Sequence, residues 1–354
     1  METAFASEFG FELCVCQWAE RQWPPDGERE GSVIVGRQIG TKRRRWDTVV
    51  VECDPDALRA RAAFGADELD SDLLHVVRNA PAEWEWYRDA LPHPGYPWQY
   101  VREAVHRAAD RGVVETRKRG NRIELRRKWV YPDWIDRIVA VENKPDLDAS
   151  AARALAPQLQ RDVAMGLADE VWVATAATDG PVEPALLEDI PVEAGVLTVD
   201  ASGEASVAWH PRALTVSDPG TRILDRPDGS DRDRSAARFE YADPGWISDK
   251  RIELAERVYG RGWRSYAGTM RPDCRHFELD PSGSGVLPRC RAKSCLPTAS
   301  ECSGSCPSFE PEPPVWRTKG WPIEGGPGAG IKRVLERRRR RHRPGLPDSA
   351  DADR

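Results

Sequence analysis

Residues 136–146 read Asp-Arg-Ile-Val-Ala-Val-Glu-Asn-Lys-Pro-Asp, and this stretch decides the predicted fold. The β-branched run Ile138–Val141 suits a buried strand, which Pro145 ends. Residues 149–167 then carry apolar side chains at helical spacing, and residues 170–174 form a second apolar strand. A strand, a helix and a strand with a crossover of this length predict a right-handed βαβ unit.

Polar side chains stand at the end of the first of these strands. Glu142 and Lys144 are two residues apart, so the alternation of a strand turns both side chains to the same face. A carboxylate beside an ammonium predicts a metal-and-water site at this strand end. A βαβ unit with a surface Glu and a surface Lys would show the same residues, so that interpretation stays open.

The ordered set of motifs has a family resemblance. Glu142-x-Lys144 closing an apolar strand, a helix with Gln158, and the strand Ala168-Asp169-Glu170-Val171-Trp172-Val173-Ala174 resemble the core of the PD-(D/E)XK nucleases. The likeness covers residues 30–52 and 130–200. It implies an α/β protein with a restriction-endonuclease-like mixed sheet flanked by helices, and hydrolysis of phosphodiester bonds in DNA.

The resemblance also implies a cofactor and a set of site residues. Mg²⁺ or Mn²⁺ would be held by an acid from an earlier strand, by Glu142 and by the backbone carbonyl of Asn143, because hard oxygen ligands suit these ions. Lys144 would orient the attacking water or stabilise transition-state charge. Gln158 would support the site from the helix, with Gln160 almost as well placed.

The first acid has three candidates. Asp47 follows a basic run and heads the apolar strand at residues 48–52, which resembles the first acidic motif of the same superfamily. Asp133, in a Pro132-Asp133 pair, and Asp136 lie closer to Glu142 in sequence. We favour Asp47 because it heads a strand directly, and the catalytic set is then Asp47, Glu142, Lys144 and Gln158.

The choice of Asp47 makes the following segment an insertion. Residues 72–79, 83–91 and 98–110 are predicted helices, and residues 113–117 and 122–128 are two strands about a Gly120-Asn121 turn. Three helices and a hairpin resemble a winged helix-turn-helix. Winged helices also serve as protein-docking modules, and that alternative stays open.

The inserted segment is locally basic in an acidic protein. A recognition-helix face and an arginine-rich wing would contact phosphates without reading sequence themselves. The candidate nucleic-acid-binding residues are Gln99, Arg102, His106, Arg107, Arg117, Lys118, Arg119 and Arg122.

Five of the eight cysteines follow residue 270. A Gly-, Pro- and Ser-rich stretch without a core of its own suits a metal that supplies folding energy. We select Cys274, Cys290, Cys302 and Cys306 as ligands and leave Cys295 out. Zn²⁺, an Fe–S cluster and unliganded thiols all remain open, since the spacing matches no standard run; some nucleases of the superfamily carry an Fe–S cluster in such a C-terminal position.

Composition sets the outer limits. The 354 residues permit two or three domains, and the formal net charge of −6 means that local patches must supply any nucleic-acid binding. No apolar run reaches the roughly 18 residues of a membrane helix, and the N-terminus lacks a signal-peptide pattern, so we expect a cytoplasmic protein with no membrane contact. The acidic, arginine-rich composition resembles proteins of salt-loving archaea, and the whole chain resembles an uncharacterised haloarchaeal protein family.

The predicted organisation has six parts. They are a first core part (1–66), the inserted winged helix (67–130), a second core part (131–200), a linker or irregular cover (201–246), a small Cys-rich C-terminal segment (247–330) and a disordered charged tail (331–354). A metal-dependent deoxyribonuclease is the predicted function. A catalytically inactive DNA-binding regulator of the same fold and a metal-stabilised protein-interaction module are the alternatives, and the oligomeric state is not readable.

Overall fold

The structure is a computed structural model. It describes residues 5, 7–27, 31–41, 44–93, 95–178, 182, 188–225, 238–268, 270–280, 287–302, 305–311 and 333. The predicted tail at 331–354 therefore lies outside the described residues, apart from residue 333.

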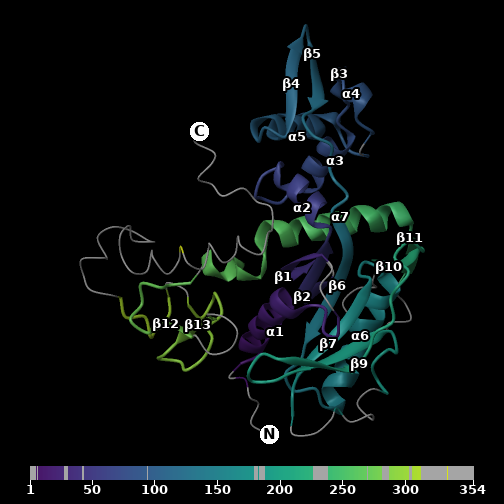
Figure 1. Cartoon of the computed structure of the whole chain (residues 1–354). Coiled ribbons are helices and arrows are strands. Elements are labelled where there is room, and N and C mark those ends of the chain that lie inside the picture. The colour runs from purple at the N-terminus through teal and green to yellow at the C-terminus, as the bar shows by residue number, and fades with distance from the viewer. Residues whose placement is uncertain are drawn as a thin grey trace.

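A mixed six-stranded sheet is the centre of the molecule (Figure 1). Its order is β1-β2-β6-β7-β8-β9, in which β6 runs parallel to β7 and β7 parallel to β8 while the other neighbours are antiparallel. The strands are β1 (Ser32–Gly40), β2 (Arg45–Cys53), β6 (Ile135–Asn143), β7 (Glu170–Ala176), β8 (Ala194–Val199) and β9 (Ala205–Trp209).

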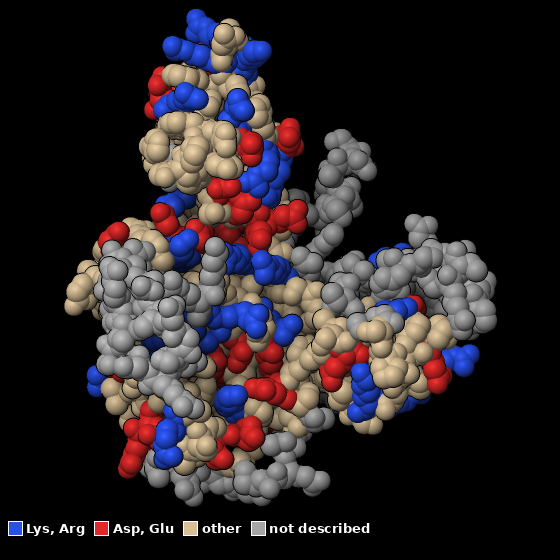
Figure 2. Space-filling view, turned by 180° about the vertical axis from the view of Figure 1, so that it is seen from behind, with Lys and Arg blue, Asp and Glu red and all other residues tan. Residues whose placement is uncertain are grey.

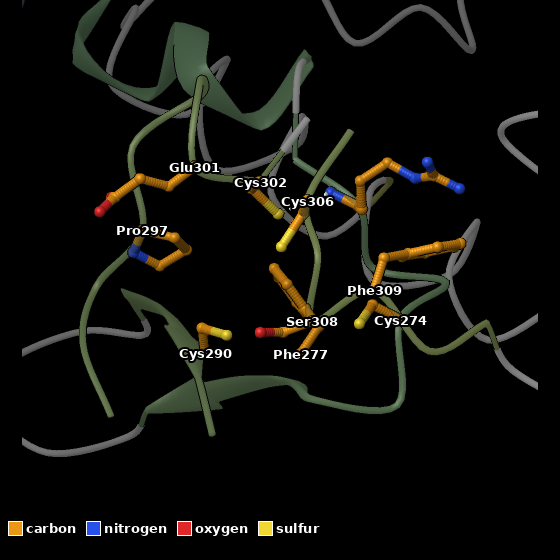
Figure 3. Close-up of a pocket in the computed structure, with 10 residues that line it drawn as sticks. Cys274, Phe277, Cys290, Pro297, Glu301, Cys302, Cys306, Ser308 and Phe309 are labelled. Carbon is orange, nitrogen blue, oxygen red and sulfur yellow. Dashed lines mark hydrogen bonds between the residues drawn. The ribbon is translucent and has the colours of Figure 1, made fainter. Parts of the chain in front are cut away.

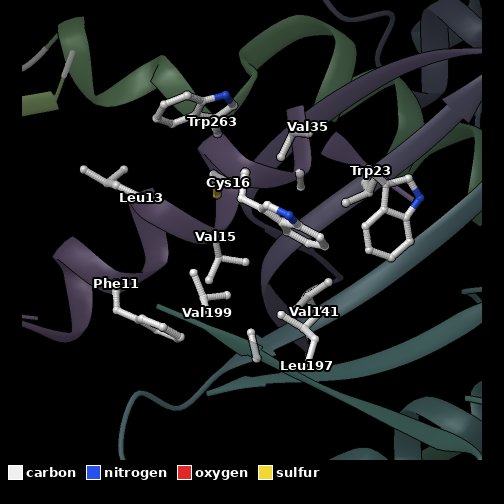
Figure 4. Close-up of a cluster of buried hydrophobic side chains, with 14 of the residues drawn as sticks. Phe11, Leu13, Val15, Cys16, Trp23, Val35, Val141, Leu197, Val199 and Trp263 are labelled. Atoms are coloured by element: carbon white, nitrogen blue, oxygen red, sulfur yellow. The ribbon is translucent and has the colours of Figure 1, made fainter. Parts of the chain in front are cut away.

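Helices cover both faces of this sheet. Helix α1 (Glu8–Gln22) packs on one face, where Phe11 and Val15 meet Val141, Leu197 and Val199 (Figure 4). Helices α6 (Ala149–Met165) and α7 (Pro244–Arg261) bury their apolar sides on the other face. Apolar residues that alternate along the strands thus build two cores, which is the arrangement of an α/β fold covered on both sides.

The predicted βαβ unit is confirmed. Strand β6 is followed by α6 and then by the parallel neighbour β7. Asp169, just before β7, fixes the start of the unit: its carboxylate accepts a 2.6 Å hydrogen bond from the Ile138 backbone N–H and pairs with Arg251 of α7 at 2.7 Å. One acid therefore joins β6, β7 and α7.

The segment between β2 and β6 forms a body with its own apolar core, above α7 in Figure 1. Its elements are α2 (Pro55–Ala62), α3 (Ser71–Asn79), β3 (Glu85–Trp86), α4 (Tyr87–Ala90), α5 (Trp98–Asp110), β4 (Val114–Arg119) and β5 (Arg122–Arg127). The helix predicted over residues 83–91 is largely wrong. Its first part pairs with β5 as strand β3, and one helical turn follows.

The predicted linker over residues 201–246 also needs correction. Strand β9, which lies within this predicted linker, joins the central sheet beside β8. Strands β10 (Gly220–Asp225) and β11 (Arg238–Ala242) pair antiparallel, and α7 begins within the predicted linker at Pro244.

The Cys-rich segment follows the short helix η3 (Trp263–Gly268). Strands β12 (Phe277–Asp280) and β13 (Leu287–Cys290) pair there as a two-stranded sheet. Among the helices of the described residues, none combines the length and the apolar composition that crossing a bilayer requires.

Candidate functional site

A row of polar side chains crosses three strands at one end of the sheet. The pairs Arg37↔Thr48 and Ile39↔Trp46 place Gln38 opposite Asp47, and the pair Thr48↔Val141 places Asp47 opposite Glu142. Directly opposed residues of antiparallel strands have Cβ atoms about 4.5–5.5 Å apart. The structure therefore brings Asp47 and Glu142 side by side, and these two carboxylates are called the acid row.

Hydrogen bonds fix both oxygens of Asp47. Its Oδ2 accepts from the backbone N–H of Asn143 at 3.0 Å, and its Oδ1 accepts from the Gln38 amide at 2.8 Å. The same Gln38 nitrogen donates to Glu12 Oε1 of α1 at 2.8 Å. Gln38 has φ of 55°, a left-handed conformation that non-glycine residues seldom adopt outside functional or tightly determined positions. One amide thus ties two carboxylates from different elements.

An arginine binds the Glu142 side chain. Arg44 Nη2 lies 2.7 Å from Glu142 Oε2 and 2.7 Å from Asp162 Oδ2 of α6, and Arg44 Nε donates to Asp162 Oδ1 at 2.8 Å. A bidentate pair of this kind is strong and geometrically specific. Arg44 therefore fixes α6 to the site and partly neutralises the Glu142 carboxylate.

Burial changes the acidity of two of these carboxylates. Burial, followed by the nearby Asp47 carboxylate, raises the pKa of Glu142 to about 7 against the lowering effect of Arg44. Burial also raises the pKa of Glu12 to about 7, with Arg37 and Gln38 opposing it. Acids with such shifted pKa values gather at functional sites, because desolvated carboxylates are costly to keep for structure alone.

Lys144 lies just beyond the end of β6. Its Nζ pairs with Glu8 Oε1 of α1 at 3.1 Å. Burial lowers its pKa, but the Glu8, Asp47 and Glu142 carboxylates outweigh that effect and raise it overall. The lysine therefore stays charged, but its partner Glu8 lies on α1, whereas the Arg44–Asp162 pair that holds Glu142 lies against α6 on the other face of the sheet.

Gln158 lies one helical turn before Asp162 on α6. Its side chain is half-buried, whereas Gln160 is exposed. Within the described residues, the buried Gln158 Oε1 has no hydrogen-bond partner. A buried amide oxygen without a partner is uncommon, and it fits a side chain that supports a bound group.

A cavity of about 570 Å³ opens beside the acid row. The sheet and α1 line it with Glu8, Glu12, Gln38, Asp47 and Asn143, and the Cys-rich segment adds Cys295, Thr298 and Glu301. Its volume falls within the range of about 300–1,000 Å³ that small-molecule sites occupy.

The rival first acids lie elsewhere. Asp133 and Asp136 are exposed and stand near Asp54, at the opposite end of β6 from Glu142. Six residues of extended strand separate Asp136 from Glu142, which is about 20 Å. The structure therefore joins Asp47, and neither rival, to Glu142.

The oxygens at the row are those that Mg²⁺ or Mn²⁺ prefers. The Asn143 amide group donates to Thr48 Oγ1 at 3.0 Å, which leaves its Oδ1 buried and without a partner among the described residues. As the side chains stand, no three His, Cys, Asp or Glu residues of the described chain are gathered closely enough to hold an ion. A cation would therefore replace the Gln38 and Arg44 groups that now occupy Asp47 and Glu142.

The predicted nucleic-acid-binding residues lie in two places, on α5 and on the β4–β5 hairpin. Gln99, Arg102 and His106 are exposed on α5, but Arg107 pairs with Asp70 and Asp72 at 2.7 and 3.1 Å. Lys and Arg side chains gather at the outer end of the β4–β5 hairpin, at the top of Figure 2, and the exposed ones include Arg117, Lys118, Arg119 and Arg122.

Tryptophans support this hairpin. The guanidinium groups of Arg117 and Arg126 lie over the Trp84 ring at 4.5 and 4.7 Å, and that of Arg122 lies over the Trp86 ring at 4.6 Å. Stacking of this kind holds the arginines in extended positions.

Sequence reasoning missed four residues of the site, namely Glu12, Gln38, Arg44 and Asp162. Glu12 carries a signal in the sequence, because it is the one charged residue in the run from Phe9 to Cys16. The other three show no sequence signal, since their roles depend on which strands and helices meet.

The four selected cysteines also come together. Cys274, Cys290, Cys302 and Cys306 line one small cavity (Figure 3). Cys295 instead lines the larger cavity beside Asp47.

Together these features define an α/β protein in which a mixed six-stranded sheet, flanked by helices, carries a buried acid row at one end. The chain belongs to the family described as a family of unknown function (DUF5787), whose model matches residues 34–311. No curated protein and no solved structure matches the chain.

Proposed function

We propose that this protein is a divalent-metal-dependent nuclease of the restriction-endonuclease-like fold that hydrolyses phosphodiester bonds in DNA. The observation that carries the proposal is the acid row, where Asp47 and Glu142 stand opposite each other on neighbouring strands, with Lys144 just beyond the end of β6. The pKa of Glu142, raised to about 7, adds the electrostatic signature of a site built for a cation.

In this proposal each side chain of the site has a separate role. Asp47 and Glu142, with the backbone carbonyl of Asn143, would hold Mg²⁺, which lowers the pKa of bound water and offsets charge that builds on the phosphate. Lys144 would orient the water or stabilise transition-state charge. Glu12 holds Gln38, and through it Asp47, while Gln158 supports the row from α6.

The exposed arginines of the β4–β5 hairpin support DNA as the substrate. In this proposal the body between β2 and β6 is a winged helix-turn-helix whose wing contacts phosphates, while Gln99, Arg102 and His106 face the duplex from α5. Phosphate contacts position a protein on DNA and make its affinity depend on salt.

The decisive experiment is cleavage of plasmid DNA with and without Mg²⁺ or Mn²⁺. We expect metal-dependent cleavage that falls to background in Asp47→Asn and in Glu142→Gln. Asp136→Asn is the matched control, since it removes one carboxylate from the other end of β6. Absence of cleavage by folded wild-type protein, or equal loss in the control, would sink the nuclease proposal.

A DNA-binding regulator without catalytic activity is the second candidate, and the Arg44–Glu142 ion pair at 2.7 Å favours it. If the Arg44–Glu142 ion pair persists at high salt concentration, Glu142 is not free to bind a metal ion. Salt-dependent DNA binding without cleavage supports this candidate, and failure to bind DNA at all supports the protein-interaction module instead.

DNA binding itself is tested by the wing. In a variant with Arg117, Lys118, Arg119 and Arg122 all changed to Ala, we expect the slope of log affinity against log salt to shrink by up to about 3.6, at about 0.9 per phosphate contact. Arg59→Ala removes an exposed arginine from α2, outside the wing, and should leave the slope unchanged. Fluorescence anisotropy with a labelled duplex measures both.

A further inference from the structure

The four cysteines around the small cavity come from separate turns of the Cys-rich segment (Figure 3). Cys290 ends β13, and its backbone N–H donates to the Cys295 carbonyl at 2.8 Å. The Cys302 N–H donates to the Thr298 carbonyl at 3.0 Å, and the Cys274 N–H to that of Arg271 at 3.1 Å. Hydrogen bonds of the main chain thus fix the turns that carry these cysteines around one cavity.

This segment has little apolar material to hold it. Its regular structure is one two-stranded sheet, and the isolated bridge Cys274↔Pro311 closes its end. Met270 and Leu287 are its buried aliphatic residues in the described chain. Small segments that lack a core are commonly held by disulfides or by a metal, and the described cysteines are all free.

The environment of Cys302 suits a metal-bound thiolate. The Arg271 backbone N–H donates to its sulfur at 3.3 Å, the kind of contact that surrounds ligating thiolates. A cation between the sulfurs would remove the cost of gathering thiolates.

The size of the space favours a single ion. The cavity measures about 20 Å³, which is room for about one water-sized occupant. Four thiolates at about 2.3 Å are the ligand set of a structural Zn²⁺. The sulfurs surround the cavity without meeting at one centre, since no three metal-binding side chains of the described residues are close enough to hold an ion, so the cysteines would turn inward on binding.

The segment between two of these cysteines also borders the acid row. Thr298 and Glu301 line the 570 Å³ cavity with Asp47, and Glu301 lines the cysteine cavity as well. Leu296 packs against α1, where a Cβ built on Gly10 would come within 2.9 Å of its Cδ1. Residues 291–301 are therefore the wall between the two cavities.

We propose that Cys274, Cys290, Cys302 and Cys306 bind one Zn²⁺, and that this ion holds residues 291–301 in place as a wall of the acid-lined cavity. Zinc binding and the placement of the wall do not depend on DNA cleavage. Only the idea that the wall borders a substrate cavity rests on the proposed nuclease function. Since Cys290 and Cys302 bracket the wall, the ion fixes both of its ends.

Metal analysis of full-length protein, purified under reducing conditions, tests the zinc site. We expect one zinc per chain, with the content falling below about half in Cys302→Ser and in Cys306→Ser. Cys295→Ser is the matched control, because it changes a cysteine of the same segment that lines the other cavity. Zinc-free wild type, iron with absorption near 400 nm, or equal loss in the control would overturn the assignment.

Hydrogen–deuterium exchange tests the wall in wild-type protein, without relying on variants that fail to fold. After a chelator removes the zinc, we expect exchange over residues 291–301 to become at least severalfold faster, while α5 is unchanged. Unchanged exchange over 291–301 would overturn the placement role. Neither readout uses DNA cleavage, so this proposal and the nuclease proposal can fail separately.

Discussion

The two ends of strand β6 each gather acids, but in opposite surroundings. At the carboxyl end, Glu142 and Asp47 lie against α1 and α6 with Glu142 buried, and Glu12 joins them from α1. At the amino end, Asp133 and Asp136 are exposed beside Asp54. The residue types match, so the covering helices alone make the ends different.

This difference teaches what to look for in an acid cluster. Exposed carboxylates are hydrated and screened by salt, so their repulsion costs little. Buried carboxylates lose hydration and repel each other strongly in a medium of low dielectric constant, so a bound cation stabilises them more than it would stabilise exposed carboxylates. Sequence proximity favours Asp136 as the partner of Glu142, whereas burial favours Asp47.

The largest expected effect that can sharpen this comparison concerns the positively charged side chain near each end of β6, which is Lys144 at the carboxyl end and Arg137 at the amino end. Lys144→Ala should lower the metal-dependent cleavage rate by about a hundredfold to a thousandfold, because a charge that stabilises the transition state is lost. Arg137→Ala removes the cation near the amino end of β6, which pairs with Glu52 and Glu170, and should leave the rate unchanged. Initial rates on plasmid DNA measure both; similar rates for the two variants would contradict a catalytic role for Lys144.

Stability should separate the same two ends. Arg44→Ala leaves Asp162, whose side chain is 3 % exposed, without its partner, and we expect the free energy of unfolding to fall by about 3 kcal/mol. Arg137 is 38 % exposed, so Arg137→Ala should cost no more than about 1 kcal/mol apart from lost packing. Urea denaturation gives both values. An Arg44 cost as small as that of Arg137 would show that the Arg44–Asp162 pair is solvated.

The last difference between the two ends is a dependence of stability on pH. Burial raises the pKa of Glu142 and of Glu12 to about 7, so the folded protein keeps protons that the unfolded chain releases from about pH 4.5 upward. Without metal, these groups should therefore lower the stability as the pH rises from about 4.5 to 7.

A cation competes with those protons. The rise in melting temperature that Mg²⁺ causes should accordingly be larger at about pH 8 than at about pH 6. Glu142→Gln should remove most of this difference, and Asp136→Asn should not. A Mg²⁺ effect that is equal at both pH values would mean that neither raised carboxyl binds the ion.

Much of the sheet could be predicted from the sequence. The βαβ unit and α5 followed from apolar periodicity, because their buried faces are continuous. Strand β9 was not predicted, since it is a five-residue strand at the sheet edge in which Ala205 and Val207 alone alternate onto the core and the other three residues are exposed. Strand β3 is only two residues long, and its pairing with β5 is a tertiary contact.

Only part of the candidate site could be predicted from the sequence. Asp47, Glu142, Lys144 and Gln158 carry a pattern, whereas Gln38 and Arg44 act through register and through the turn between β1 and β2. A one-residue shift of β1 would move the Gln38 amide to the other face of the sheet. Such residues become visible only when strand pairing is known.

The path of the chain around the inserted body has one more consequence. Cys53, the last residue of β2, is the register partner of Ile135, the first residue of β6, so the chain leaves the sheet and returns to it at a single rung. Leu58 and Trp134 belong to the core beneath β2 and β6, and Arg61 forms a fully buried pair with Glu256 of α7, so the part that the sheet does not need lies between them, from α3 to β5. This arginine-bearing part could thus be exchanged, enlarged or deleted during evolution while the acids at the opposite rim keep their alignment.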